Sequence, residues 1–420
     1  MAEFKFEGDI SNISERQLQF INKVILEQNL KIKRVIFHSF AQAGDNFMSD
    51  VKRISLEGEN GSMKVIAKIA PIDESVRASS YTEYLFKVEH IMYTEILPKL
   101  VSLQKAAKVP EEEHLRFAKC YGSLDEAPNE VIILEDLKES GYFMLDKFEP
   151  LQDNNIKSVL KTLAIFHSLS HVLRNKEPAT YDLYKNMLPD MTNISPEELK
   201  NSFKSLDDFV ATIIENEAHR KILKNKISNT LDIAPKLAKE EDPKYLVIQH
   251  GDVWVNNILF KQEDGAAVRS ILIDYQVAKT NNPSVDLLYL IFNCTDHESR
   301  SKHFYNWLDY YHFESNKSLA YFGLKADLIY PRNQVDADIK RYSEYIFGSV
   351  LLNINMTDRD RSETGEMIES LENGGLDEII ALMGKTKMNE STLKHVRNKI
   401  EGLINSYVEF GFLEHFNTIE

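Results

Sequence analysis

The sequence has few cysteines and no long apolar run, and each shortage excludes a class of protein. Cys120 and Cys294 are the only cysteines in 420 residues, and they form no Cys-x-x-Cys or Cys/His zinc spacing. A disulfide scaffold is therefore excluded, and a reducing, cytoplasmic location is expected. The longest apolar run, residues 287–292, is far shorter than the roughly 18 residues that a membrane helix needs. No signal-peptide pattern follows the N-terminus, so we expect no secretion.

The sequence also lacks an excess of positive charge. Fifty Lys and Arg stand against 65 Asp and Glu, which gives a formal net charge of −15. Such a charge repels phosphate backbones and anionic lipid, and no basic patch stands out against it. We therefore expect no nucleic acid and no membrane as partners. No obligate protein partner is evident from the sequence either. With 43% hydrophobic and 27% charged residues, the composition is that of a globular chain with one large or two modest domains.

The first third of the chain has mixed helix and strand signals. Two extended runs are separated by Gly58-Glu59-Asn60-Gly61, and Asn-Gly between such runs is a strong hairpin signal. The predicted elements are a helix over residues 14–28, strands over 51–57 and 62–69, a helix from about 75 to 100 and a buried strand over 131–134.

From Asn155 the helical period dominates, with one β-rich interruption. Three short strands are predicted there, over residues 245–249, 257–260 and 268–273. Helical patterns resume beyond Pro283. The expected architecture is therefore α+β, with a small β-rich lobe, one connecting strand and a larger helical lobe that holds a β insert.

The β insert carries residues suited to phosphoryl transfer. Asp252 is followed five residues later by Asn257, and Asp274 stands at the end of the next strand. Phosphoryl transfer needs a group that positions the attacking hydroxyl and oxygen ligands that hold Mg²⁺ on the nucleotide phosphates. Asp252 suits the first role, and Asn257 and Asp274 suit the second. Antiparallel pairing of the two strands would place Asn257 and Asp274 side by side.

Each of these residues could instead have a purely structural role, because Asp and Asn in turns often cap backbone groups. For either residue alone, capping is the favoured interpretation. His-Gly-Asp with an Asn five residues beyond would occur by chance in a chain of this length roughly once in several hundred sequences. The combination therefore favours the catalytic interpretation.

The sequence around these residues also resembles that of a known superfamily. The segment from His250 to Phe260, with Leu272-Ile273-Asp274-Tyr275-Gln276, resembles the aminoglycoside phosphotransferase and choline kinase superfamily. Trp254 and Gln276 make it most similar to the ecdysteroid kinase-like, or CHK kinase-like, family. The resemblance implies a bilobal protein-kinase-like fold, ATP and Mg²⁺ as cofactors, and a steroid-like small-molecule alcohol as the acceptor.

A lysine that reaches the α- and β-phosphates belongs on the second strand of the hairpin. Lys64 and Lys68 share one face of that strand, so spacing alone does not choose between them. Proximity to the following helix and the resemblance both favour Lys68. On that helix Glu89 lies on the apolar stripe, where a charge needs a partner. We expect it to pair with Lys68; the alternative is an ordinary carboxylate at the edge of the core.

Further nucleotide contacts are implied by the resemblance. Residues 131–137 look like the segment that connects the lobes, with adenine contacts at the backbone of Glu135 and Leu137, which divides the chain into residues 1–137 and 138–420. Asp286 resembles a carboxylate that braces the catalytic loop, although a helix N-terminal carboxylate is equally expected there. A phosphate-covering turn is implied at Gly44, Asp45, Asn46 and Ser49; without the resemblance these residues would form an ordinary turn.

Two groups of residues have competing interpretations. His167 and His171 have the i, i+4 spacing of a zinc pair, but His167 continues an apolar stripe, so a hydrogen-bonded core histidine is favoured. Trp254, Trp307 and Tyr311 are weak candidates for contacts with the acceptor. For Trp307 and Tyr311, helical spacing makes a core role more frequent.

The sequence thus predicts an ATP- and Mg²⁺-dependent small-molecule kinase, with an ecdysteroid or another alcohol as acceptor. One rival is a silent pseudokinase that binds an apolar ligand, which the joint presence of Asp252, Asn257, Asp274 and Lys68 disfavours. A protein kinase is a second rival. Only eleven residues separate Asp274 from Asp286, which leaves little room for a long activation segment.

Overall fold

The computed structural model describes residues 6–39, 50–188, 196–263, 268–359, 380, 382, 384 and 388–416. The chain divides into two compact units. The first unit comprises the described residues within Met1–Leu97 and Phe117–Phe143, and the second comprises those within Pro98–Arg116, Met144–Arg359 and Ile380–Glu420. The chain leaves the first unit after Leu97, returns to it at Phe117 and leaves it again after Phe143. The expected division after residue 137 stays a prediction.

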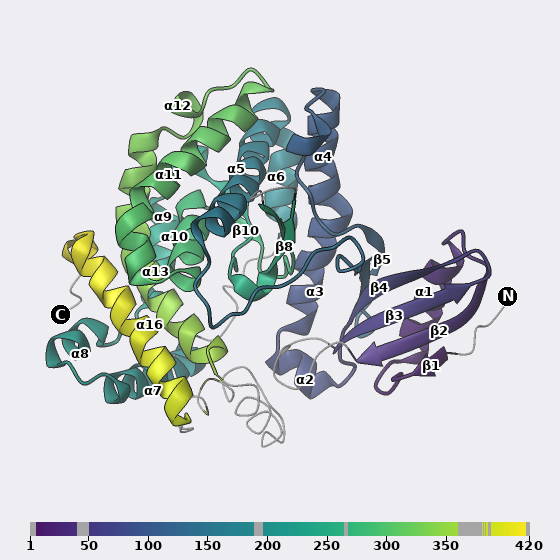
Figure 1. Ribbon diagram of the computed structural model, residues 1–420, viewed down its shortest axis with the longest axis horizontal. Helices are drawn as coiled ribbons and strands as arrows, with labels where there is room; N and C mark the ends of the chain where they lie inside the picture. Colours follow the sequence, from purple (N-terminus) through teal and green to yellow (C-terminus); the bar gives the residue numbers. More distant parts are fainter. Residues whose placement is uncertain are drawn as a thin grey trace. The chain divides into compact units, whose positions relative to one another are not determined.

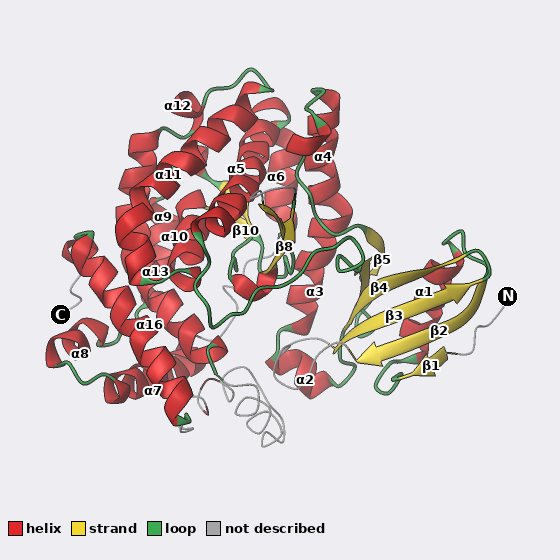
Figure 2. Ribbon diagram, in the orientation of Figure 1, coloured by secondary structure: helices red, strands yellow, loops and turns green. Residues whose placement is uncertain are grey.

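The first unit is built on a β-sheet with the strand order β1-β2-β3-β4-β6-β5 (Figures 1 and 2). β1 runs parallel to β2, and every other neighbouring pair is antiparallel. The strands are β1 (Phe6–Gly8), β2 (Ile32–Ser39), β3 (Asp50–Gly58), β4 (Gly61–Ile69), β5 (Cys120–Leu124) and β6 (Val131–Glu135). The predicted hairpin is confirmed as β3 and β4, with Gly58 opposite Gly61, and the predicted buried strand is β6.

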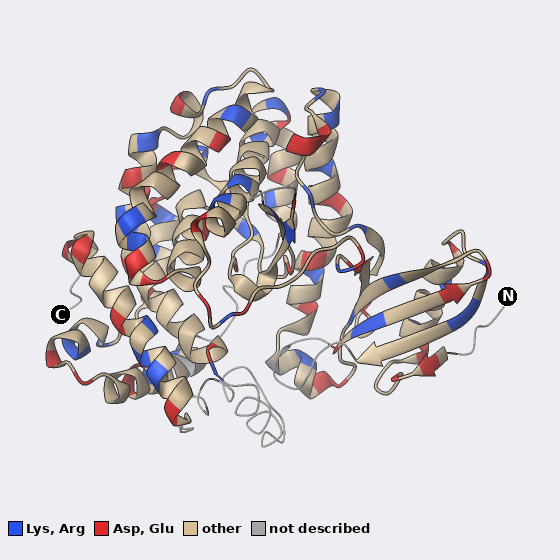
Figure 3. Cartoon of the chain, viewed as in Figure 1, with Lys and Arg blue, Asp and Glu red and all other residues tan. Residues whose placement is uncertain are grey.

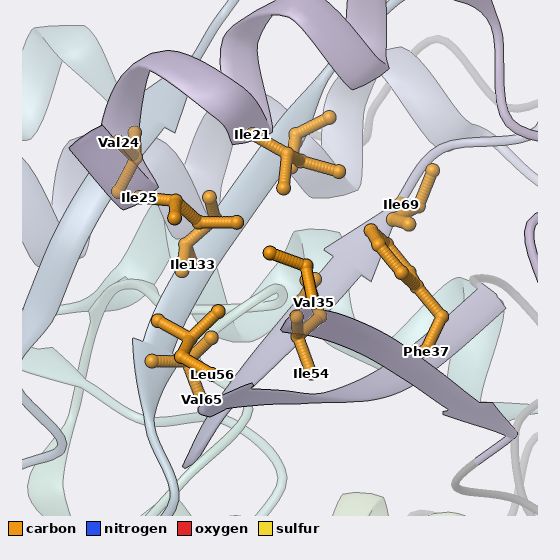
Figure 4. Packing of buried hydrophobic residues seen from close by; sticks show 12 residues of the cluster. Ile21, Val24, Ile25, Val35, Phe37, Ile54, Leu56, Val65, Ile69 and Ile133 are labelled. Atoms are coloured by element: carbon orange, nitrogen blue, oxygen red, sulfur yellow. The ribbon is translucent and has the colours of Figure 1, made fainter. Parts of the chain in front are cut away.

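The hydrophobic core of this unit lies between the sheet and helix α1 (Glu15–Leu26). Ser14 caps that helix in a capping box with Gln17, which satisfies backbone donors at its N-terminus. Figure 4 shows side chains of α1 packing onto side chains of the strands. Burial of each such side chain contributes about 1.5 to 3 kcal/mol. The labelled residues are Ile21, Val24, Ile25, Val35, Phe37, Ile54, Leu56, Val65, Ile69 and Ile133.

The single helix expected over residues 75–100 is wrong in detail. The structure has α2 (Glu74–Ser79), α3 (Thr82–Ile91), the π-helical turn Met92–Ile96 and α4 (Leu97–Ala106). The first break falls at Tyr81, whose φ of 52° lies in the left-handed region and cannot continue a right-handed helix. The apolar period therefore predicted helical structure in this segment, but it did not predict the break between α2 and α3.

The second unit is mainly helical (Figure 2). Its short strands form two antiparallel pairs, β7 with β10 and β8 with β9. The strands are β7 (Val247–Gln249), β8 (Ile258–Gln262), β9 (Val268–Leu272) and β10 (Lys279–Asn281). Besides α4, its principal helices are α5 (Asp153–Lys176), α6 (Pro178–Met187), α7 (Pro196–Ile213), α8 (Glu217–Leu223), α9 (Thr230–Glu240), α10 (Pro283–Cys294), α11 (His297–Ala320), α12 (Ala326–Ile329), α13 (Arg332–Thr357) and α16 (Glu390–Glu409).

Helix α10 lies at the centre of this unit, in contact with α5 and α13. The longest apolar run of the sequence falls in it, and Leu287, Leu288 and Leu290 are fully buried. In the part of the chain that the structure describes, no helix combines the length and apolarity that crossing a membrane requires. Acidic and basic residues are interspersed along the helices of this unit (Figure 3).

Candidate active site

In the first unit, Lys68 and Glu89 form the predicted ion pair. Strand alternation directs Ala67 and Ile69 into the core beneath α1, so Lys68 faces the opposite side of the sheet. There its Nζ donates to Oε2 of Glu89 on α3 at 2.5 Å. Lys68 is 9% exposed and Glu89 is 2% exposed, so the two charges stabilise each other in a poorly solvated environment.

Lys64, the alternative that spacing left open, has a different partner. Its Nζ lies 3.0 Å from Oε1 of Glu139, and about half of each side chain is exposed to solvent. A solvated pair of this kind contributes between about 0 and 1 kcal/mol. The structure therefore confirms Lys68 as the lysine that is paired with the buried glutamate.

The segment that follows β6 is fixed by a residue that the sequence reasoning missed. Asp136 is 2% exposed and accepts a hydrogen bond from the backbone N–H of Lys138. Its Oδ2 lies 2.7 Å from Nε of Arg53 on β3. Glu135 and Leu137 flank this ion pair, and their expected backbone contacts with adenine stay predictions. The expected phosphate-covering residues Gly44, Asp45, Asn46 and Ser49 lie outside the described residues.

In the second unit, Gly251 allows a sharp turn directly after β7. Its φ is +86°, in the region that glycine adopts without strain. A Cβ at this position would lie 2.7 Å from the backbone oxygen of Val277. The motif therefore needs glycine both for its backbone conformation and for the close approach of the neighbouring segment.

Asp286 braces the turn from the first helical turn of α10. Its carboxylate accepts the backbone N–H groups of His250 and Gly251, each at 2.9 Å, and lies 3.2 Å from Nε2 of His167. Burial opposes ionisation of Asp286, but these hydrogen bonds bring its pKa below the usual value. Asp286 therefore both braces the loop and lies near a helix N-terminus, so the two interpretations that were equally expected from the sequence are both present.

His250 links the turn to the end of β9. Its Nδ1 accepts the backbone N–H of Asp252 at 3.2 Å, and its Nε2 lies 2.9 Å from the carbonyl oxygen of Ile273. This set of partners assigns the neutral tautomer with the proton on Nε2. The ring therefore holds the loop that carries Asp252 at a fixed distance from the strand end that carries Asp274.

Asn257 and Asp274 are brought together as expected. Ile258 pairs with Leu272 across the β8–β9 ladder, and the N–H of Ile273 donates to the carbonyl oxygen of Asn257 at 3.0 Å. Asp274 follows directly with a φ of +66°, a costly conformation for a residue with a side chain. Such strain persists where the surrounding structure enforces it, typically at functional sites.

The Asp252 carboxylate is oriented by Asn257. Nδ2 of Asn257 donates to its Oδ2 at 2.8 Å and to its backbone oxygen at 2.9 Å. The polar groups of Tyr289 and Trp254 also favour the ionised form of the carboxylate. Burial, with the negative charge of Asp274, raises the pKa of Asp252 to about 7 against the opposing effect of these donors. This value suits a group that accepts a proton near neutral pH.

The donor atoms present here fit a magnesium ion. Because both contacts of the Asn257 amide nitrogen go to Asp252, the amide oxygen is the atom left to bind a cation. Asp274 adds a carboxylate, and oxygen ligands are those that Mg²⁺ prefers. Among the described residues, no group of three His, Cys, Asp or Glu could hold a metal ion. Mg²⁺ bound with a nucleotide needs fewer protein ligands, because phosphate and water complete its shell.

The three candidate acceptor contacts lie in different surroundings. Trp254 is partly buried, and its backbone N–H donates to the carbonyl oxygen of Asp252 at 3.2 Å. Trp307 is fully buried and donates from Nε1 to Asp153 at 2.8 Å. Tyr311 is 2% exposed, with its hydroxyl 3.0 Å from Nδ1 of His167. These contacts favour a packing role for Trp307 and Tyr311.

His167 and His171 do not form a zinc pair in the structure. His167 lies between Asp286 and Tyr311, so both ring nitrogens have hydrogen-bond partners. The ring of His171 accepts from Arg174 at 2.8 Å, and burial holds the pKa of His171 well below its usual value. The predicted hydrogen-bonded core histidine is therefore confirmed for His167.

His250 is the second-unit residue whose contacts the sequence reasoning missed. His250 is part of the motif itself. No local signal indicated that its ring, rather than a side chain from another element, would join the two halves of the motif.

Several solved structures are similar to the chain at low identity. A microcompartment-associated aminopropanol kinase is 10% identical with a TM-score of 0.45, over 95% of this chain and 100% of that chain. A Plasmodium vivax ethanolamine kinase is 15% identical with a TM-score of 0.40, over 91% of this chain and 83% of that chain. A spectinomycin phosphotransferase, solved with ADP and spectinomycin, is 15% identical with a TM-score of 0.39, over 87% and 98% of the two chains.

No curated protein matches the sequence. The model of the ecdysteroid kinase-like family matches residues 43–323, which is more than half of the chain and includes Lys68, Asp252, Asn257 and Asp274. The chain therefore belongs to the ecdysteroid kinase-like family.

Proposed function

We propose that this protein transfers the γ-phosphoryl group of Mg-ATP to a hydroxyl of an ecdysteroid or a similar polyhydroxylated, apolar compound. The single observation that carries the proposal is the setting of Asp252. Its carboxylate is oriented by Asn257, stands next to Asp274 and has a pKa near neutrality. The steroid-like acceptor is supported by family membership, and other alcohols belong to the same reaction class.

The reaction forms one bond to phosphorus and breaks another. The acceptor oxygen attacks the γ-phosphorus, and the bond between that phosphorus and the β–γ bridging oxygen breaks, so that its electron pair leaves with ADP. The hydroxyl proton passes to the Asp252 carboxylate late in the transfer. With a pKa of about 7, Asp252 can hold this proton transiently and then release it to water.

Asn257 and Asp274 would hold the metal through an amide and a carboxylate oxygen. Bound Mg²⁺ would offset the negative charge of the β- and γ-phosphates. Its positive charge next to Asp252 would also favour the ionised form of that carboxylate, which is the form that accepts a proton. Asn257 and Asp274 would therefore help to bind the nucleotide through Mg²⁺ and would also keep Asp252 in the ionised form that accepts a proton.

Lys68 would neutralise the α- and β-phosphates, with Glu89 fixing the direction of its ammonium group. The 2.5 Å contact in a buried setting supports this role, because a flexible lysine without such a partner would lose more conformational freedom on binding phosphate. We assign the adenine contacts to the backbone of Glu135 and Leu137. The phosphate-covering turn is assigned to Gly44, Asp45, Asn46 and Ser49 on the family resemblance alone.

A catalytically silent protein that binds an apolar ligand is the alternative. It would have no need to keep a strained Asp274, an oriented Asp252 and a buried Lys68–Glu89 pair. Each of these features carries an energetic cost that transfer chemistry explains and simple ligand binding does not. The observations therefore favour the enzyme.

Mass spectrometry of alcohols incubated with Mg-ATP tests the proposal. The panel combines ecdysteroids, other sterols, amino alcohols and sugars, and Asp252→Asn protein is the control. We expect a phosphoryl mass gain on an ecdysteroid with the wild type and none with the variant. A gain on another class of alcohol would replace the acceptor assignment, and the absence of Mg-ATP binding would favour the silent protein.

A further inference from the structure

Two ion pairs join the segment after β6 to the sheet of the first unit. Nε of Arg53 on β3 lies 2.7 Å from Oδ2 of Asp136. Nζ of Lys64 on β4 lies 3.0 Å from Oε1 of Glu139. The Asp136 side chain is 3% exposed, whereas both side chains of the second pair are about half exposed. The first pair therefore holds a carboxylate that water stabilises little, so its partner matters more.

Arg53 lies on the face of the sheet that carries Lys68. It stands directly opposite Ile66 in the β3–β4 ladder, and residues opposite each other in a ladder share a face. Ile66 is two residues before Lys68 on β4, so these two side chains share that face as well. The ion pair is therefore on the same face of the sheet as the lysine assigned to the nucleotide phosphates.

The guanidinium of Arg53 contacts both oxygens of the Asp136 carboxylate. Besides the contact of Nε with Oδ2, its Nη2 donates to Oδ1 at 3.4 Å. Two contacts from a planar group fix the direction of a carboxylate as well as its position. Oδ1 of Asp136 in turn accepts the backbone N–H of Lys138 at 3.1 Å. Arg53 thus helps to determine how the chain from Asp136 to Lys138 lies against the sheet.

Leu137 lies within the turn that this carboxylate closes. Its carbonyl oxygen accepts the backbone N–H groups of Ser140 and Tyr142, each at 3.1 Å, so its backbone is held from that side too. Leu137 is 5% exposed, yet no described residue accepts a hydrogen bond from its own backbone N–H. Backbone donors in poorly solvated places are normally paired. This N–H is therefore available to an acceptor atom of a bound molecule.

We propose that the Arg53–Asp136 ion pair positions the backbone of Leu137 for the base of the nucleotide. The N–H of Leu137 then donates to a ring nitrogen of adenine. Arg53 and Asp136 are positioning residues, because they act through Leu137 and need no contact with the nucleotide. The inference rests on the proposed function, since it assigns the pair to the ATP site of that reaction.

Calorimetric titration with three ligands tests the proposal without turnover. Mg-ATP has a base and phosphates, adenosine has the base alone, and Mg-tripolyphosphate has phosphates alone. We expect Asp136→Asn to bind Mg-ATP and adenosine about tenfold more weakly, since the loss of about one hydrogen bond to the base corresponds to such a factor. The affinity for Mg-tripolyphosphate should not change, whereas damage to the whole unit would weaken all three ligands.

Glu139→Gln is the matched control, because it breaks the exposed ion pair that joins the same segment to Lys64. It should change the affinity for none of the three ligands. In the kinase assay, Asp136→Asn should raise KM for Mg-ATP about tenfold and leave kcat at saturating Mg-ATP unchanged. An unchanged affinity for Mg-ATP in Asp136→Asn, an equal loss for all three ligands, or the same loss in Glu139→Gln overturns the proposal.

A double-mutant cycle on the affinity for Mg-ATP shows whether the two residues act as a pair. Arg53→Met removes the guanidinium and keeps an unbranched side chain. It should weaken Mg-ATP binding as much as Asp136→Asn does, and the double variant should lose no more than either single variant. Additive losses would mean that Arg53 and Asp136 act separately on the nucleotide, and they overturn the proposal.

Failure of this inference and failure of the proposed function give different results. A wild type that shows this binding pattern but phosphorylates no alcohol overturns the proposed function and leaves the role of the ion pair established. A wild type that phosphorylates an alcohol, with unchanged Mg-ATP affinity in Asp136→Asn, overturns the inference alone. A wild type that binds no Mg-ATP overturns both.

Discussion

Replacing Asp252 by Asn should remove activity and raise stability, and the gain in stability should depend on pH. In the folded protein the pKa of Asp252 is about 7, against 3.8 for the side chain in water. Folding therefore favours the protonated carboxyl group. The stability associated with this preference is fully present below pH 3.8 and is lost as the pH rises to about 7.

The size of the effect follows from the pKa difference. A shift of one pKa unit corresponds to about 1.4 kcal/mol, so Asp252 costs the folded state about 4 kcal/mol above pH 7 and about 1.6 kcal/mol at pH 5. Asparagine does not titrate. The variant should therefore gain about 3 kcal/mol more over wild type at pH 8 than at pH 5, which corresponds to a difference of about 3 °C in the unfolding midpoint of a chain of this length.

Thermal unfolding at pH 5 and pH 8 measures this difference without any substrate. Hydrogen bonds that asparagine makes or loses contribute equally at both pH values, so they cancel in the comparison. Asp182→Asn, at an exposed position of α6, serves as the control and should show no such pH dependence. The reasoning is refuted if the stability difference between the Asp252 variant and wild type is the same at pH 5 and pH 8.

Three further predictions concern residues of the first and of the second unit. Glu89→Gln should lower the free energy of unfolding by about 3 kcal/mol in urea titration, because it leaves the buried Lys68 ammonium without its carboxylate partner. Glu139→Gln, which removes the exposed pair with Lys64, should lower it by less than about 1 kcal/mol. Equal losses of stability in the two variants would contradict the buried pairing. Asp274→Ala should abolish Mg²⁺-dependent binding of ATP in calorimetry, and a normal titration would exclude it as a metal ligand. Gly251→Ala should lower the melting temperature and abolish turnover, because its Cβ would meet a backbone oxygen at 2.7 Å; unchanged activity would show that the loop tolerates another conformation.

The sequence predicted local structure best where a period was uninterrupted. The β3–β4 hairpin and β6 followed from alternation and the Asn-Gly turn. β2 escaped prediction because its register shifts between Ile32 and Arg34, and this irregularity breaks the alternation. β10 is only Lys279–Asn281, three polar residues that become a strand because β7 lies beside them.

The sequence by itself determined that Asp252, Asn257 and Asp274 would meet. They lie within 23 residues of one another, and two short antiparallel strands bring their ends together whatever the rest of the chain does. A local arrangement of this kind depends on backbone pairing alone.

Spacing alone did not choose between Lys64 and Lys68, and only the tertiary structure showed which of them pairs with Glu89 and how Asp136 and His250 hold the segments around them. A period of two places both lysines on one face, but it does not show which of them a distant helix will cover. The raised pKa of Asp252 has the same origin. It depends on burial by segments far away in the sequence. The spacing of residues within the motif does not indicate how much water those segments exclude.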